Sequence, residues 1–111
     1  MSLKSERVSS ELIKELNQIL LTESTNKKFK QISITGADVS SDLSFAKVYF
    51  SVFNEKEKDE LTTELTKAVP FFKKMLSEKL DIRQIPNLRF IYDESIEYGN
   101  KIEKLIQKIN K

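Results

Sequence analysis

One proline, Pro70, constrains the fold more than any other residue, because it stands inside a long apolar pattern of helical spacing. The residues of that pattern recur at intervals of three and four: Leu61, Leu65, Ala68, Phe72, Leu76 and Leu80. Proline has no N–H to bond the carbonyl of Thr66, and its ring clashes there, at a cost of about 3 kcal/mol in a helix interior. Val69, which precedes proline and is β-branched, is also pushed away from helical geometry. We therefore predict a helix, a break at Ala68 to Pro70, and a second helix.

Two segments before this helix pair show the alternation of strands. Ile32 and Ile34 alternate with polar neighbours, but Val39 has the opposite parity, so one strand buries all three only with a bulge, most naturally at Gly36-Ala37. After a polar turn, residues 45–53 are rich in β-branched and aromatic residues and predict the second strand of a hairpin. One face of that strand carries Ala46, Val48, Phe50 and Val52, and the other carries Phe45, Lys47, Tyr49 and Ser51. The mixed second face predicts a sheet partly open to solvent or a partner.

The remaining segments complete the expected order. Residues 5–21 predict an amphipathic helix, whereas the polar residues 22–30 predict a solvated loop. Asn54, with Glu57 three residues on, is a candidate cap for the kinked helix, and residues 88–92 alternate as a third strand. Asp93 or Ser95 is expected to cap a final helix whose apolar face holds Ile102, Leu105, Ile106 and Ile109. The order α, β, β, kinked α, β, α predicts an α+β fold in one domain, residues 1–111, with helices on one face of a three-stranded sheet.

The chain contains neither cysteine nor histidine, which removes most catalytic chemistry. Without cysteine there is no disulfide, thiolate nucleophile or sulfur-ligated zinc, and without histidine the usual general base and the commonest metal ligand are missing. We therefore expect no enzyme activity, no metal and no cofactor. Apolar residues never run more than three together, so we expect no membrane span and a cytoplasmic protein.

The charge is polarised along one stretch, although the net charge is only +2. Residues 54–66 carry five acids against two lysines, which gives −3. Residues 67–89 carry six bases against two acids, which gives +4. The distribution of charge is therefore more informative than its sum, and the chain is electrically polarised along this stretch.

Three runs of this sequence resemble the bacterial ribosome-binding factor A family. They are Arg7-Val8, the hairpin run 42–49 (DLSFAKVY), and the run 86–95 (PNLRFIYDES) followed by Gly99 and Ile102. Together they span nearly the whole chain in the family's order. The resemblance implies a KH-like fold of the type II order, binding to the immature 30S subunit and its 16S rRNA, assistance in maturation of the rRNA 5′ end, and an association with growth in the cold.

The chain departs from a true KH domain at the kink. KH domains clamp a nucleic-acid backbone with a G-x-x-G loop between two helices, and this chain has glycine only at Gly36 and Gly99. The family replaces that loop with a helix-kink-helix that usually carries A-x-G. Here Ala68-Val69-Pro70 occupies the position, so proline stands where glycine is usual.

On this basis we expect the second half of the kinked helix to present the RNA site. A helix that restarts at Pro70 has unpaired N–H groups near Phe71 and Phe72, which form a natural anion site, and Lys67, Lys73 and Lys74 lie within about a turn of it. The alternative is that Pro70 only shapes the core and the lysines form a solvated face. Further candidates for RNA contact are Lys79, Arg83, Arg7, Lys27, Lys28 and Lys30.

Tyr49 and Phe45, on the mixed strand face, are candidates for stacking on bases. The alternative for both is packing across strands or beneath a covering helix. For the whole chain, the competing function is a small protein-interaction module of the same αββαβ layout that binds a partner protein such as an assembly GTPase. We expect a monomer whose partners are the 30S subunit, the 16S rRNA precursor and other assembly factors.

Overall fold

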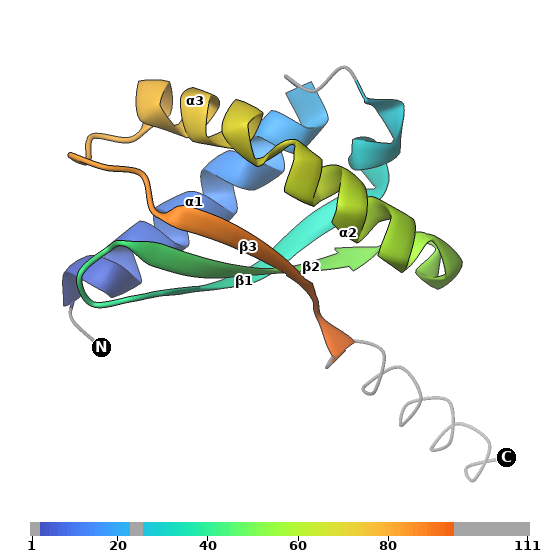
Figure 1. Ribbon diagram of the computed structural model, residues 1–111, viewed down its shortest axis with the longest axis horizontal. Helices are drawn as coiled ribbons and strands as arrows, with labels where there is room; N and C mark the ends of the chain where they lie inside the picture. Colours follow the sequence, from blue (N-terminus) through green and yellow to red (C-terminus); the bar gives the residue numbers. More distant parts are fainter. Residues whose placement is uncertain (1–2, 23–25, 95–111) are drawn as a thin grey trace, which may run out of the picture.

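Three strands form one mixed sheet in a computed structural model that describes residues 3–22 and 26–94. Strand β1 (Ile32–Val39) pairs antiparallel with β2 (Phe45–Val52), and β2 pairs in parallel with β3 (Asn87–Tyr92). β2 is therefore the central strand, and β1 and β3 are the edges (Figure 1). The predicted hairpin and third strand are confirmed.

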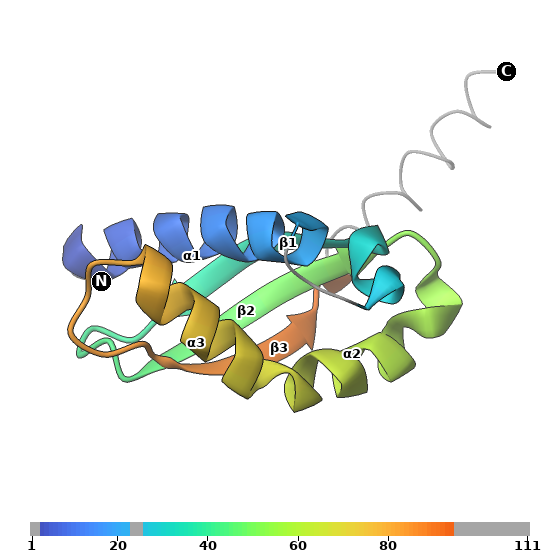
Figure 2. The same cartoon turned by 90° about the horizontal axis from the view of Figure 1, so that it is seen from above.

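Helices cover one face of this sheet. α1 (Leu3–Thr22) lies along β1, while α2 (Lys58–Lys67) and α3 (Val69–Lys79) lie toward β3, as the view from above shows (Figure 2). Two short 3₁₀ helices, η1 (Lys27–Gln31) and η2 (Glu55–Glu57), connect the longer elements. The predicted α+β layering is thus confirmed, and the predicted final helix lies outside the described residues.

A single hydrophobic core fills the space between sheet and helices. The helical stripe of α1, from Val8 to Leu20, is buried there, as are the inward residues Ala46, Val48 and Phe50 of β2. Leu88 and Phe90 of β3 complete the layer beneath α2 and α3. The outward residues of the strands are exposed or half-buried, so the predicted division of the two sheet faces is confirmed.

The break in the second helical region falls where proline predicted it. α2 ends at Lys67, Ala68 lies between the helices, and α3 starts at Val69 with Pro70 in its first turn, where an N–H is not required. The N–H of Ala68 closes α2 by donating to the carbonyls of Glu64 and Leu65, each at 3.1 Å. Pro70 therefore starts one helix and stops the extension of the other.

Several local predictions need correction. Residues 22–30 were expected to be a solvated loop, but residues 27–31 form η1 and bury Phe29, which is 4% exposed, because its ring fills the core end beside Phe72. The bulge lies between Ile34 and Gly36, one residue earlier than expected, and it still lets Val39 face the core. The second strand stops at Val52, and Phe53 is 93% exposed.

Asn54 also acts differently from the prediction. Its side chain accepts a hydrogen bond from the N–H of Lys56 and caps η2, not α2. The carboxylate of Glu57 accepts a hydrogen bond from Gln31 Nε2 at 2.8 Å, so it holds η2 against η1. Asn54 and Glu57 therefore stabilise η2, the turn that leads into α2, and do not cap α2 itself.

The loop between β1 and β2 is organised by Asp42. Its carboxylate accepts hydrogen bonds from the hydroxyls of Ser44 and Ser40, each at 2.7 Å, and from the N–H of Ser44 at 3.1 Å. The hydroxyl of Ser44 contributes most, and together these donors lower the pKa of Asp42 to about 2. Leu43, next to it, has φ 61°, a left-handed conformation that costs energy for a non-glycine residue. The carboxylate helps to offset that cost.

The stabilisation by Asp42 is expected to depend on pH. Because the folded-state pKa of about 2 lies below the ordinary value of 3.8, the contribution is complete above pH 3.8 and is lost as pH falls toward 2. Urea unfolding of the wild type and of Asp42→Asn across that range measures it, and the difference between the two proteins should shrink as pH falls. A difference that stays constant down to pH 2 would contradict this role.

Candidate nucleic-acid interface

The surface around the helix kink is formed by the end of α2 and the first turns of α3. Lys67, the last residue of α2, is exposed, and so is Pro70, whereas Val69 is half-buried. Lys74 lies on the outer ridge of α3 with Pro70 and Ser77, all of them exposed. The predicted lysines therefore flank the break, with Lys67 before it and Lys74 beyond it.

The new helix N-terminus offers fewer free donors than predicted. The N–H of Phe72 donates to the carbonyl of Ala68, the N-cap residue of α3, at 3.0 Å, so this N–H is not available to an anion. Pro70 has no N–H, so helix geometry leaves Val69 and Phe71 as the residues of this turn without an intrahelical acceptor. An anion at the kink would depend mainly on the lysines.

Lys73 connects the kink to the edge of the sheet. Its Nζ donates to Oδ1 of Asn87, the first residue of β3, at 3.1 Å. Two residues along the same face of β3 lies the exposed Arg89. Arg89 was not among the predicted contacts, although its parity on the third strand could have indicated it.

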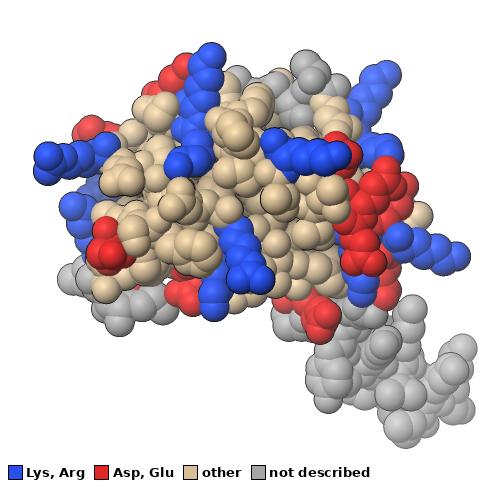
Figure 3. Space-filling view, viewed as in Figure 1, with Lys and Arg blue, Asp and Glu red and all other residues tan. Residues whose placement is uncertain are grey.

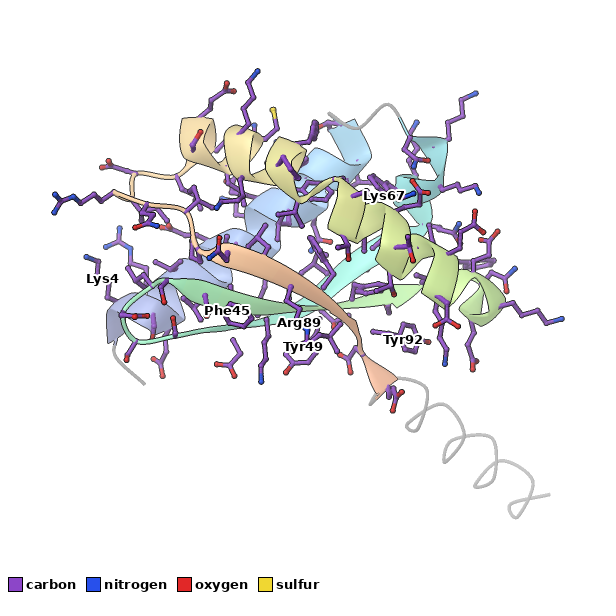
Figure 4. The ribbon with its side chains drawn as sticks, in the orientation of Figure 1. Lys4, Phe45, Tyr49, Lys67, Arg89 and Tyr92 are labelled. Atoms are coloured by element: carbon purple, nitrogen blue, oxygen red, sulfur yellow. The ribbon has the colours of Figure 1, made fainter. Side chains whose placement is uncertain are left out.

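Figure 3 shows how charge is distributed over this side of the molecule. Lys and Arg side chains stand apart from one another across a mostly uncharged surface, whereas Asp and Glu gather at the end where α2 begins. The acids of η2 and of the first turn of α2 are Glu55, Glu57, Asp59 and Glu60. Lys67 and Arg89 are both in view in the matching orientation of Figure 4. On this side of the molecule the acidic stretch of the chain is thus gathered in space, whereas the basic side chains are spread out (Figure 3).

A second basic group lies at the opposite end of the fold. Arg7 and Lys79 line a hollow of about 440 Å³ between α1 and the end of α3. Arg83 lines an adjoining hollow of about 300 Å³, and Lys4, labelled in Figure 4, lines both. The hollows also carry Glu11, Glu15, Asp42 and Asp81, so their charge is mixed. Lys4 and Lys14 also line the first hollow. They were not among the predicted contacts, although their helical spacing from Arg7 could have indicated that the three side chains lie near one another.

The third group, on η1, lies beside the acidic end. Lys28 forms an ion pair with Glu60, and the hydrogen bond in this pair raises the pKa of Lys28. Lys27 and Lys30 are exposed on the same short helix. The nearby carboxylates weaken the case for an anion here. The nine predicted basic residues therefore belong to three parts of the fold: the kink, the hollows beside α1, and η1.

The face of the sheet away from the helices carries further candidates. Phe45 and Tyr49 project from β2 on this side, together with Lys47, and Figure 4 shows Phe45, Tyr49 and Arg89 on the side of the sheet away from the helices. No helix among residues 3–22 and 26–94 covers it. The alternative of a covering helix therefore finds no support within these residues.

Other kinds of site find no counterpart in the described residues. Within residues 3–22 and 26–94, carboxylates form no cluster of three or more that could hold a metal ion. In the same ranges, no helix is long and apolar enough to cross a membrane.

Comparison with known proteins finds matches over nearly the whole chain. Residues 4–106 match the family model described as Ribosome-binding factor A. The ribosome-binding factor A of Staphylococcus carnosus is 44% identical over 110 residues, which covers 98% of this chain and 96% of that protein.

Solved structures show the same fold at lower sequence identity. The crystal structure of ribosome-binding factor A from Thermus thermophilus matches with a TM-score of 0.67 and 20% identity, over 79% of this chain and 94% of that one. A model of the Thermus thermophilus factor fitted into a cryo-EM map of a 30S complex matches with a TM-score of 0.65 and 20% identity, over 78% of this chain and 91% of that one. The predicted KH-like fold is thus confirmed.

Proposed function

Because this chain belongs to the ribosome-binding factor A family, we propose that it binds the immature 30S ribosomal subunit through 16S rRNA and assists maturation of the rRNA 5′ end. It acts as a monomer in the cytoplasm, without catalysing a reaction itself, and other assembly factors are its further partners. The contact with rRNA is made by Lys67, Lys73 and Lys74 around the helix kink.

One observation carries the choice of this surface. The chain breaks its second helical region at Ala68 and sets exposed lysines on both sides of the break, away from the acids at the start of α2. Lysines around a helix start suit phosphate, since ammonium groups and unpaired N–H groups both attract anions. The related Thermus thermophilus protein fitted into a map of a 30S complex supports the choice of partner.

The kink surface is tested by replacing Lys67, Lys73 and Lys74 with glutamine in the full chain. Each lost phosphate contact is expected to reduce the slope of log affinity against log salt by about one. Binding to purified 30S subunits, measured over a series of potassium concentrations, should therefore become weaker and less dependent on salt. Unfolding curves of the variant check that the fold survives.

The matched control replaces Lys27, Lys28 and Lys30, which makes the same change in net charge beside the acidic end. We expect this control to lose less affinity, because Lys28 is already paired with Glu60. Equal losses in both variants would mean that only overall charge matters. Unchanged affinity and salt slope in the kink variant, with 30S binding intact, would favour a protein-interaction module that contacts a protein of the subunit.

The proposed role in rRNA maturation needs a separate measurement. In cells that lack the protein, the fraction of 16S rRNA with an unprocessed 5′ end should rise, and the wild-type chain should lower it again. The kink variant should restore processing less well than the variant at Lys27, Lys28 and Lys30. Normal processing in the absence of the protein would contradict this part of the proposal.

A further inference from the structure

The face of the sheet away from the helices combines aromatic and basic side chains. Phe45, Lys47 and Tyr49 project from the central strand β2, and Arg89 and Ile91 project from β3. We name these five residues the sheet platform. The register places Lys47 opposite Arg89 and Tyr49 opposite Ile91, so the platform is continuous across two strands.

Tyr49 has a cross-strand neighbour on each of the two adjacent strands. On β1 its partner is Gly36, where a Cβ would lie 3.7 Å from Cδ2 of Tyr49, so the ring lies in ordinary contact range of the glycine. On β3 its neighbour is Ile91. Phe45, at the start of the strand, is 37% exposed. Two aromatic rings thus lie on a rigid surface with access to solvent.

The basic side chains of the platform form no ion pair within the described residues. Like charges directly opposite across strands are unfavourable, yet Lys47 and Arg89 are partners. Asp38 lies opposite Lys47 on the other side, but within residues 3–22 and 26–94 neither Lys47 nor Arg89 makes an ion pair. An anionic partner would relieve this repulsion.

The charge of the chain's own last residues has the wrong sign for this purpose. Residues 95–111 contain four lysines and two glutamates, a net charge of +2 from side chains. This segment would add positive charge to Lys47 and Arg89. Charge complementarity therefore favours a nucleic acid over the C-terminal residues as the occupant of the platform.

The platform is also continuous with the surface around the kink. Lys73 of α3 bonds Asn87 at 3.1 Å, and Asn87 and Arg89 lie on the same face of β3. A strand of RNA held by phosphate contacts at the kink would reach the platform by passing around this edge.

We propose that the sheet platform is a second RNA contact, which stacks unpaired bases on Tyr49 and Phe45 and holds the neighbouring phosphates with Lys47 and Arg89. This inference rests on the proposed function and names the form of RNA that the second surface takes. The RNA is single-stranded, because bases in a duplex cannot expose their faces to a protein side chain.

The test uses the full chain and a fluorescent single-stranded RNA of about 12 nucleotides, a length that suits binding by stacking. Fluorescence anisotropy should show that Tyr49→Leu weakens binding roughly tenfold and that Phe45→Leu with Tyr49→Leu weakens it further. Tyr49→Phe keeps the ring and should bind as the wild type does. The aromatic variants should leave the salt slope unchanged, whereas Lys47→Gln and Arg89→Gln should each reduce it by about one.

Two matched controls lie outside the platform. Phe53→Leu removes an aromatic ring that is 93% exposed, and Lys56→Gln removes an exposed lysine of η2. Both should bind the single-stranded RNA as tightly as the wild type. If Tyr49→Leu has an altered unfolding curve, the remaining variants still test the platform. Phe45→Leu should weaken binding, Lys47→Gln should reduce the salt slope, and Tyr49→Phe should do neither.

The outcomes separate this inference from the proposed function. Wild-type affinity for single-stranded RNA in the Phe45, Tyr49 and Lys47 variants overturns the platform, even where the kink variant loses 30S binding. A wild-type chain that binds 30S subunits but not single-stranded RNA, while Tyr49→Leu loses 30S binding, overturns it too and assigns the face to a ribosomal protein. If the wild type does not bind 30S subunits at all, the proposed function itself fails.

Discussion

Replacing Phe72 with alanine is expected to lower the free energy of unfolding by about 3–5 kcal/mol, a large part of the stability of a domain of this size. The side chain is 0% exposed. Its ring centroid lies 5.9 Å from that of Phe29, 5.7 Å from Phe71 and 5.5 Å from Phe90. Alanine would leave a cavity where α3, η1 and β3 meet. Urea unfolding followed by circular dichroism measures the loss.

Two variants make this prediction specific. Phe72→Leu keeps much of the volume and should cost clearly less than alanine, while Phe53→Ala should change stability by less than about 0.5 kcal/mol, because Phe53 is 93% exposed. A loss below about 1 kcal/mol for Phe72→Ala would show that the aromatic cluster does not hold α3 against the sheet.

The second large effect is expected at Asn17, which joins α1 to the edge strand β1. Its Oδ1 accepts from the N–H of Ile34 at 2.7 Å, and its Nδ2 donates to the carbonyl of Ile34 at 3.1 Å. These backbone groups lie where the bulge begins, on the side of β1 where the described residues form no further strand. Asn17→Ala should cost about 2–3 kcal/mol, because two partly buried polar groups lose their partner.

The neighbouring Gln18 provides the control for Asn17. It is exposed on the same helix, so Gln18→Ala should be nearly neutral. Asn17→Asp keeps the acceptor and loses the donor, and it should fall between wild type and alanine. Hydrogen exchange at the amide of Ile34 should become faster in Asn17→Ala. Unchanged exchange there would mean that the tether does not protect this edge.

Both positions matter for interpreting binding experiments. Phe72 holds the first turns of α3 and thereby positions the kink, while Asn17 anchors the edge strand next to the ring of Tyr49. Losses of RNA binding in variants at these two positions would follow from altered structure. The kink lysines and the platform residues, which are on the surface, provide the tests of contact.

Local chemistry determined much of the fold in advance. Pro70 placed the helix break, because the missing N–H and the fixed ring act on residues within one turn. The alternation from Phe45 to Val52 placed the central strand and assigned its two faces. The opposite parity of Val39 required a bulge, and only its position was wrong by one residue. In each case neighbours in sequence decide the outcome.

The structure of the candidate site depended on contacts between distant parts of the chain. Phe29 is a core residue because its ring packs beside that of Phe72. The positive charge of Lys28 is balanced because Glu60, distant in sequence, forms an ion pair with it. The pairing of Lys47 with Arg89 required the parallel register of β2 and β3.

The sequence by itself thus determined the order of elements, the helix break, the faces of the strands and the resemblance to the family. Only the tertiary structure decided which charges meet: it sorted nine basic candidates into three groups and brought two others, Lys47 and Arg89, together on the face of the sheet away from the helices. The physical reason is the distance along the chain over which each effect acts. Helical and strand periodicity act over a few residues, whereas the electrostatic surface is set by the packing of segments far apart in the chain.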